Sequence, residues 1–244
     1  MPMRSALLTV LTLALAPAWA QSNRYLEAGI PDVSREWNGG DYVRAVQVLV
    51  EGKVSLPRLS DPQGAALLRR ITSTGTFARY RDKSLPLDPR LEDFDKVYQQ
   101  TNVLLKLYLA EPVIGGVAPH QELAALVAFL LQGSALWIDL IDEIIPTIPK
   151  DPTSEAQMAA LQEMRAGLTQ VFQGAEETLE SQLLSTDDRS VILEAMESSL
   201  PKVKKAFPEE VRVELRKKLE EDKARFSAER DLQRLGAMIR ELSV

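Results

Sequence analysis

The chain has no cysteine and a single histidine, His120, in 244 residues. Without cysteine the protein has no disulfide bonds, no thiolate metal sites and no cysteine nucleophile. A zinc site or a di-iron helical bundle needs more than one imidazole, which this chain alone does not supply. The sequence also lacks a Gly-x-Ser-x-Gly elbow, a P-loop and a glycine-rich dinucleotide fingerprint. These absences favour a protein without catalytic activity, and we expect no cofactor.

The chain also has fewer basic than acidic residues, with 29 Lys and Arg and 35 Asp and Glu, which gives a net charge of −6. A net acidic chain is poorly suited to neutralising phosphates, so we expect no nucleic-acid partner. Apolar residues make up 45% of the chain and charged residues 26%. This balance is typical of a globular protein and not of a disordered one.

The first twenty residues have the three parts of a secretory signal peptide. Arg4 supplies a positive charge, residues 6–16 form a short apolar run, and Ala18 and Ala20 are the small residues of a cleavage site. We therefore expect cleavage after Ala20, which makes Gln21 the first residue of the mature chain. The apolar run is about half the ~20 residues of a membrane-spanning helix.

The absence of cysteine has two consequences for an exported chain. A lipid anchor at the new N-terminus would need a cysteine there, and small secreted animal domains usually depend on disulfides. We therefore expect a soluble protein in the periplasm of a Gram-negative bacterium, with an extracellular location as the alternative.

Helical periodicity runs through almost the whole chain, and no convincing strand alternation is present. The pattern predicts an all-α fold with seven to eight helices, arranged as a bundle or an irregular stack. Residues 123–131 are apolar on every side, which predicts a central helix over about 120–145 that other helices enclose. Because polar Gln132 ends this run after nine residues, we predict a core helix and no membrane span in the mature chain.

Proline and capping residues divide the chain. Asp61-Pro62 predicts a helix that runs to about Arg81 and is weakened by Thr72–Thr76 and Gly75, and Asp88-Pro89 predicts the start of the next one. Three prolines in 146–152 predict a linker or a bend. Later helices are expected to begin at Thr153 or at Ser154, where Ser154 and Gln157 would form a capping box, and to break at Pro201. The last one is expected to run from Pro208 to Leu242, straight or with a bend. The predicted regions are a signal peptide (1–20), an N-terminal helical region (21–145), the linker (146–152) and a C-terminal helical region (153–244), with the two helical regions packed as one unit.

The segment from Gly40-Asp41-Tyr42 to Pro57 resembles the second helix of a tetratricopeptide repeat, which commonly has a Gly-Asp-Tyr start and a closing proline. The resemblance covers fewer than twenty residues. It implies a helical hairpin unit, whereas an ordinary amphipathic helix after a Gly-Asp turn explains the same residues and is our preferred interpretation.

One group of acidic residues is a candidate metal site. Asp139 lies three and four residues before Asp142 and Glu143, so the three carboxylates share a helix face. Oxygen ligands of this kind hold hard divalent cations. The alternative hypothesis for function is therefore a metal-dependent hydrolase or lyase, and the competing interpretation is a polar helix edge paired with arginines.

Two groups of basic residues are candidate contacts for an acidic surface. They are Arg69, Arg70, Arg79, Arg81 and Lys83 in the first group, and Lys202, Lys204, Lys205, Arg212, Arg216, Lys217 and Lys218 in the second. Acids follow the second group directly, which is also typical of a solvated helix face. Our leading hypothesis is a non-enzymatic periplasmic binding or protein-interaction module, whose partner is another periplasmic protein or a lipid headgroup surface.

Overall fold

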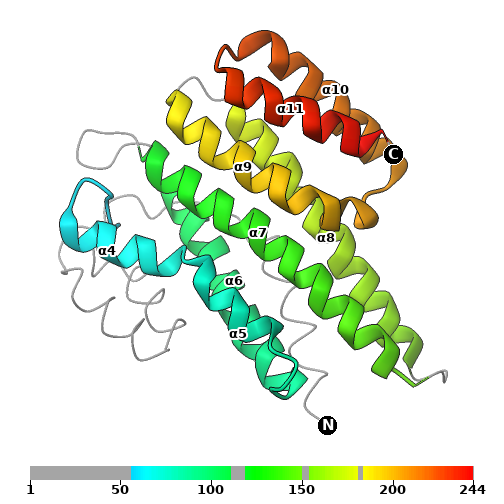
Figure 1. Ribbon diagram of the computed structural model, residues 1–244. Helices are drawn as coiled ribbons and strands as arrows, with labels where there is room; N and C mark the ends of the chain where they lie inside the picture. The colour runs from blue at the N-terminus through cyan, green and yellow to red at the C-terminus, as the bar shows by residue number, and fades with distance from the viewer. Residues whose placement is uncertain (1–55, 111–118, 150–153, 181–183, 244) are drawn as a thin grey trace. The chain divides into compact units, whose positions relative to one another are not determined.

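The structure is a computed structural model that describes residues 56–110, 119–149, 154–180 and 184–243. Within these ranges it contains eight α-helices and no strand, so the predicted all-α class is confirmed there. The cleavage residues Ala18, Ala20 and Gln21 lie outside the described residues, as does nearly all of the tetratricopeptide-like segment. The helices are α4 (Pro62–Ile71), α5 (Phe77–Arg81), α6 (Leu87–Ala110), α7 (His120–Ile144), α8 (Glu155–Leu179), α9 (Thr186–Val203), α10 (Glu209–Arg225) and α11 (Glu229–Leu242) (Figure 1).

The chain forms two compact units, and the division falls inside α7, between Leu126 and Val127. Among the described residues, the first unit contains α4, α5, α6 and the first turns of α7. The second unit contains the rest of α7 and α8 to α11. The role of residues 146–152 as a linker stays a prediction.

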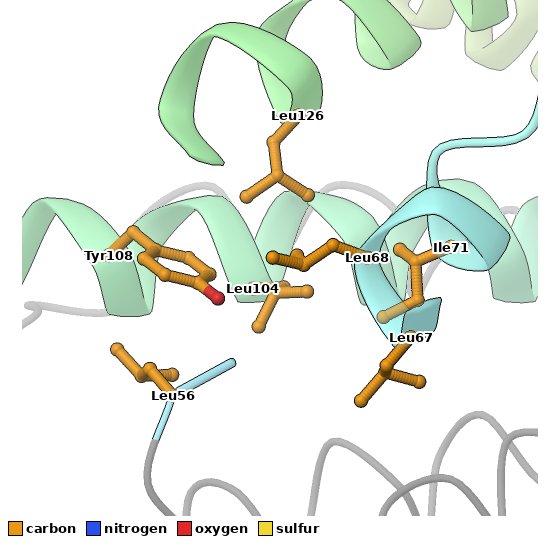
Figure 2. Packing of buried hydrophobic residues seen from close by; sticks show 7 residues of the cluster. All are labelled: Leu56, Leu67, Leu68, Ile71, Leu104, Tyr108 and Leu126. Atoms are coloured by element: carbon orange, nitrogen blue, oxygen red, sulfur yellow. The ribbon is translucent and has the colours of Figure 1, made fainter. Parts of the chain in front are cut away.

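A cluster of buried side chains forms the core of the first unit (Figure 2). Its members come from the segment before α4, from α4, from α6 and from the start of α7, and they are Leu56, Leu67, Leu68, Ile71, Leu104, Tyr108 and Leu126. The Tyr108 hydroxyl donates a hydrogen bond to the Pro57 carbonyl, so the polar end of this ring is satisfied inside the core. Burial raises the pKa of Tyr108 well above its ordinary value, so the hydroxyl stays protonated and can donate this hydrogen bond.

The segment that leads into α4 is fixed to the first turn of α7 by a buried carboxylate. Glu122 Oε1 accepts hydrogen bonds from Arg58 Nε at 3.0 Å and from the Leu59 backbone N–H at 2.6 Å. Only 2% of the Glu122 side chain is exposed. The carboxylate therefore joins two segments that lie more than sixty residues apart in sequence.

The N-terminus of α4 follows the predicted capping pattern, but the helix is shorter than predicted. Asp61 is the N-cap residue and accepts a 2.6 Å hydrogen bond from the Gly64 N–H, with Pro62 as the first helical residue. The prediction of one helix to Arg81 is wrong, because α4 ends at Ile71 and a 3₁₀ turn at Thr74–Thr76 precedes α5. The Thr72 hydroxyl donates to the Leu68 carbonyl, a local bond of the kind that competes with helix continuation.

Helix α7 is the most apolar helix that the sequence predicts, and most of it is buried. Together with the turn that follows, over His120–Thr147, it is long and apolar enough to cross a membrane, with a mean hydropathy of 1.8 in its most apolar stretch. The count of nine consecutive apolar residues therefore underestimated the apolar length of helix α7. In the structure 83% of that stretch is buried, as the predicted enclosure requires.

The second unit is built from long helices that pack side by side. Helix α11 packs against α9 and α10, and α8 packs against α9 and α10 (Figure 1). The most deeply buried apolar side chains at these contacts include Leu168 and Phe172 of α8, Ile192 and Met196 of α9, Leu219 of α10, and Leu235 and Met238 of α11.

Polar contacts fix α11 on α9. The Ser190 hydroxyl donates to Asp231 at 2.6 Å, and Arg234 of α11 reaches Glu194 at 2.8 Å and Glu197 at 3.3 Å. Since both Ser190 and Asp231 are buried, this hydrogen bond satisfies groups that would otherwise lose their water without compensation.

In the second unit the structure corrects one predicted capping box and two predicted helix boundaries. Ser154 is the N-cap of α8, but its side chain makes no capping hydrogen bond; the capping box is instead at Ser185 and Asp188, where α9 begins. Helix α9 continues through Pro201 to Val203, because a proline in the last turn removes little of the hydrogen-bond ladder. The predicted final helix is two helices, which an extended residue at Phe226 separates.

Candidate functional site

The carboxylates singled out from the sequence lie near the C-terminal end of α7, and Asp139 and Asp142 form ion pairs with neighbouring helices. Asp139 forms an ion pair with Lys202 of α9. Asp142 Oδ1 lies 2.7 Å from Arg165 Nη2 of α8. The pairs attach α7 to its two neighbours in the second unit, and Glu143 is half-buried beside them.

A metal ion at these carboxylates would have to displace Lys202 and Arg165. Over the ranges that the structure describes, no group of three or more His, Asp or Glu side chains is arranged to hold a metal ion. The metal hypothesis for Asp139, Asp142 and Glu143 stays a prediction, with the geometry favouring the polar-edge interpretation.

Most of the second basic group is engaged within the protein. Lys204 Nζ lies 2.8 Å from Glu241, and Lys218 Nζ lies 2.7 Å from Glu176. Lys202 forms an ion pair with Asp139, and Arg212 forms one with Glu209. A cation already paired with a carboxylate has less to gain from a lipid phosphate.

Two buried acids between α8 and α10 form a site that the sequence analysis did not select. Glu176 of α8 and Asp222 of α10 are both fully buried. Lys218 donates to Glu176 Oε2 at 2.7 Å. The other Glu176 oxygen and both Asp222 oxygens are buried without a hydrogen-bond partner. Arg225 Nη1 lies 3.7 Å from Asp222 Oδ1, an ion-pair distance and not a hydrogen bond.

Burial changes the acidity of both carboxyl groups. It raises the pKa of Asp222 from 3.8 to about 6, an increase that Arg225 opposes and that Glu176, Glu180 and Glu221 reinforce. Burial also raises the pKa of Glu176, while the hydrogen bond from Lys218 acts in the opposite direction. The same hydrogen bond raises the pKa of Lys218. The site therefore contains two buried acids. Glu176 has a close, hydrogen-bonded cation in Lys218, whereas Asp222 has only the more distant Arg225.

The sequence does contain a signal for these acids. Asp222 follows Leu215 and Leu219 at helical spacing, and Glu176 follows Leu168 and Phe172 in the same way. An acid at a core-facing position of an amphipathic helix is unusual enough to mark a special environment. The sequence instead grouped Asp222 with Glu220 and Glu221 as acids of a solvated helix face, and for Asp222 this prediction is wrong because its side chain is buried.

Comparisons with known proteins do not add a family to this picture. No family model matches the chain, and neither a curated protein nor a solved structure matches it.

Proposed function

We propose that this chain is an exported, soluble helical protein that works by binding another protein in the periplasm and not by catalysis. Its helices form a bundle or irregular stack in which α7 is the central apolar helix. Supporting this, the sequence has a signal-peptide pattern with cleavage residues Ala18 and Ala20 and contains no cysteine.

The observation that carries the proposal is the pairing of Asp139 with Lys202 and of Asp142 with Arg165. These aspartates are the residues that the enzyme hypothesis needs. Their ion pairs join helices, which gives the carboxylates a structural role without any metal.

The choice of a protein partner over a lipid surface rests on the same kind of evidence. The basic residues near α9 and α10 are largely ion-paired within the chain. Large apolar side chains exposed in the described ranges are few and lie on different elements, namely Leu85, Leu109, Val191 and Val213. A partner would therefore meet a polar, charged surface, and its binding should weaken as salt screens that charge.

Thermal unfolding with and without Mg²⁺ or Mn²⁺ separates the proposal from the metal-dependent enzyme. We expect no shift in melting temperature with either ion. The substitutions Asp139→Asn and Lys202→Met should each lower stability by only about 0–1 kcal/mol, since both side chains are partly exposed. A metal-induced rise in melting temperature that Asp139→Asn abolishes would show that these carboxylates bind a metal ion, as the enzyme alternative requires, and would contradict the proposal.

The binding role has its own test. The protein, cross-linked in cells at native expression and recovered from the periplasmic fraction, should carry one reproducible protein partner that high salt releases. Vesicles rich in anionic lipid should not retain the purified protein. Recovery of the free chain alone, or firm binding to the vesicles, contradicts the proposal.

A further inference from the structure

The contact between α8 and α10 contains a carboxyl group with an unusual environment. Asp222 is fully buried, and neither of its oxygens has a hydrogen-bond partner. Its closest cation, Arg225, approaches to 3.7 Å but has a half-exposed side chain. An ionised carboxylate in such a place loses its hydration without the hydrogen bonds that normally compensate.

The charges around Asp222 are mainly negative. From α8, Glu176 and Glu180 repel an ionised Asp222, and from α10 itself Glu221 does the same. Arg225 is the attracting group, but it also pairs with Glu180 at 3.4 Å and with Glu221 at 3.8 Å. Its charge is therefore shared among three acids.

The other charged groups near the turn between α10 and α11 are engaged elsewhere. Lys218 of α10 donates to Glu176. Arg189 of α9 lies over the ring of Phe226, 5.4 Å from its centroid. Asp231 of α11 accepts a hydrogen bond from the Ser190 hydroxyl. These groups leave Asp222 as the carboxyl whose charge the packing tolerates least.

We propose that the contact between α8 and α10 is a proton-dependent lock, which is tightest when Asp222 is protonated and loosens when Asp222 ionises. Protonation of Asp222 removes a buried negative charge. It also gives Asp222 an O–H group that can donate a hydrogen bond, and Glu176 Oε1 of the adjacent helix α8 is an acceptor without a partner. Ionisation restores the repulsion from Glu176, Glu180 and Glu221. The lock does not depend on the proposed function.

The sign and size of the effect follow from linkage. The folded protein holds the Asp222 proton with a pKa of about 6, and the ordinary value is 3.8. The folded state therefore binds more protons than the unfolded state between these values, and the stabilisation present at low pH is lost as pH rises through 6. Between about pH 4.5 and about pH 7.5, this raises the unfolding equilibrium constant roughly thirtyfold relative to a chain without the group.

Urea unfolding of the full chain and of Asp222→Asn across this pH range tests the lock. The ratio of the wild-type unfolding constant to that of Asp222→Asn should rise roughly thirtyfold from about pH 4.5 to about pH 7.5. Glu220→Gln is the matched control, because Glu220 is an exposed acid on the same helix. The ratio of the wild-type unfolding constant to that of Glu220→Gln should stay nearly constant across the same pH range. A constant ratio for Asp222→Asn, or the same rise for Glu220→Gln, overturns the proposal.

A second variant and a local measurement complete the test. Glu176→Gln removes one of the acids that repel Asp222, so the midpoint of the wild-type pH dependence should move to lower pH; an unchanged midpoint counts against the lock. Hydrogen-exchange protection factors of α10 amides should fall above pH 6 in the wild type and not in Asp222→Asn. Protection of α10 that is independent of pH in both proteins also overturns the proposal.

Discussion

Glu122 is a single side chain that holds two distant parts of the first unit together. Its buried carboxylate accepts from a partly buried guanidinium and from a backbone N–H. A charge-assisted bond in such a site contributes more than an exposed ion pair, chiefly because its loss leaves buried groups unsatisfied.

Replacing Glu122 with alanine should therefore destabilise the protein by about 2–3 kcal/mol in urea unfolding, since the Leu59 N–H and Arg58 both lose their acceptor. Glu122→Gln keeps an acceptor for the N–H and should cost less. The control is Arg79→Ala, which breaks the exposed 2.8 Å pair with Asp93 and should cost at most about 0.5 kcal/mol. Equal costs for Glu122→Ala and Arg79→Ala would show that the carboxylate does not fix the segment.

At the scale of single helices, glycines have opposite roles in α4 and α8. A Cβ on Gly64 would lie 2.5 Å from the Arg58 carbonyl oxygen and 2.6 Å from the Arg58 nitrogen. Both are backbone atoms, so the contact cannot be relieved by turning a side chain. A Cβ on Gly174 in α8 would meet nothing within 4 Å.

Gly64→Ala should consequently destabilise the protein by about 1–3 kcal/mol, because the segment before α4 has to move. Gly174→Ala should stabilise it by about 0.4–1 kcal/mol, because alanine has the better helix propensity and restricts the unfolded chain. Thermal unfolding of the two variants measures both values. Destabilisation by Gly174→Ala would contradict the open space around the Gly174 Cα.

The two ends of α4 differ in how far they could be predicted from the sequence. The start of α4 was predictable because Asp61, Pro62 and Gly64 are neighbours in the chain, and local hydrogen bonds decide a cap. The interruption after Ile71 was predicted only as a weakness at Thr72–Thr76 and Gly75, because none of these residues taken singly has to end a helix.

The candidate site was predictable only in part, for the same reason. Asp139 and Asp142 were found from their spacing on one helix, but their partners Lys202 and Arg165 come from other helices. Lys202 lies 63 residues from Asp139 in the chain, and only the packing of α9 on α7 brings the two together. Pairings of this kind depend on tertiary structure, which periodicity does not specify.

At the scale of the whole molecule, the export proposal predicts the mass of the mature protein. Protein recovered from the periplasm should lack residues 1–20 and begin at Gln21, as intact-mass measurement will report. Ala20→Tyr should block cleavage, since the position needs a small side chain, and the precursor should accumulate. Ala14→Leu, in the apolar run, should leave cleavage unchanged. A full-length chain in the cytoplasm would refute the proposal.

The continuity of α7 has a practical consequence. The two units divide between Leu126 and Val127, within the first third of an unbroken helix that runs from His120 to Ile144. No loop is present there at which either unit could be excised, and a fragment that starts at Val127 would leave up to four backbone N–H groups without their helical acceptors. Gene rearrangement could not exchange one unit for another at this point without cutting the helix. Truncating or exchanging either unit at this point therefore breaks α7.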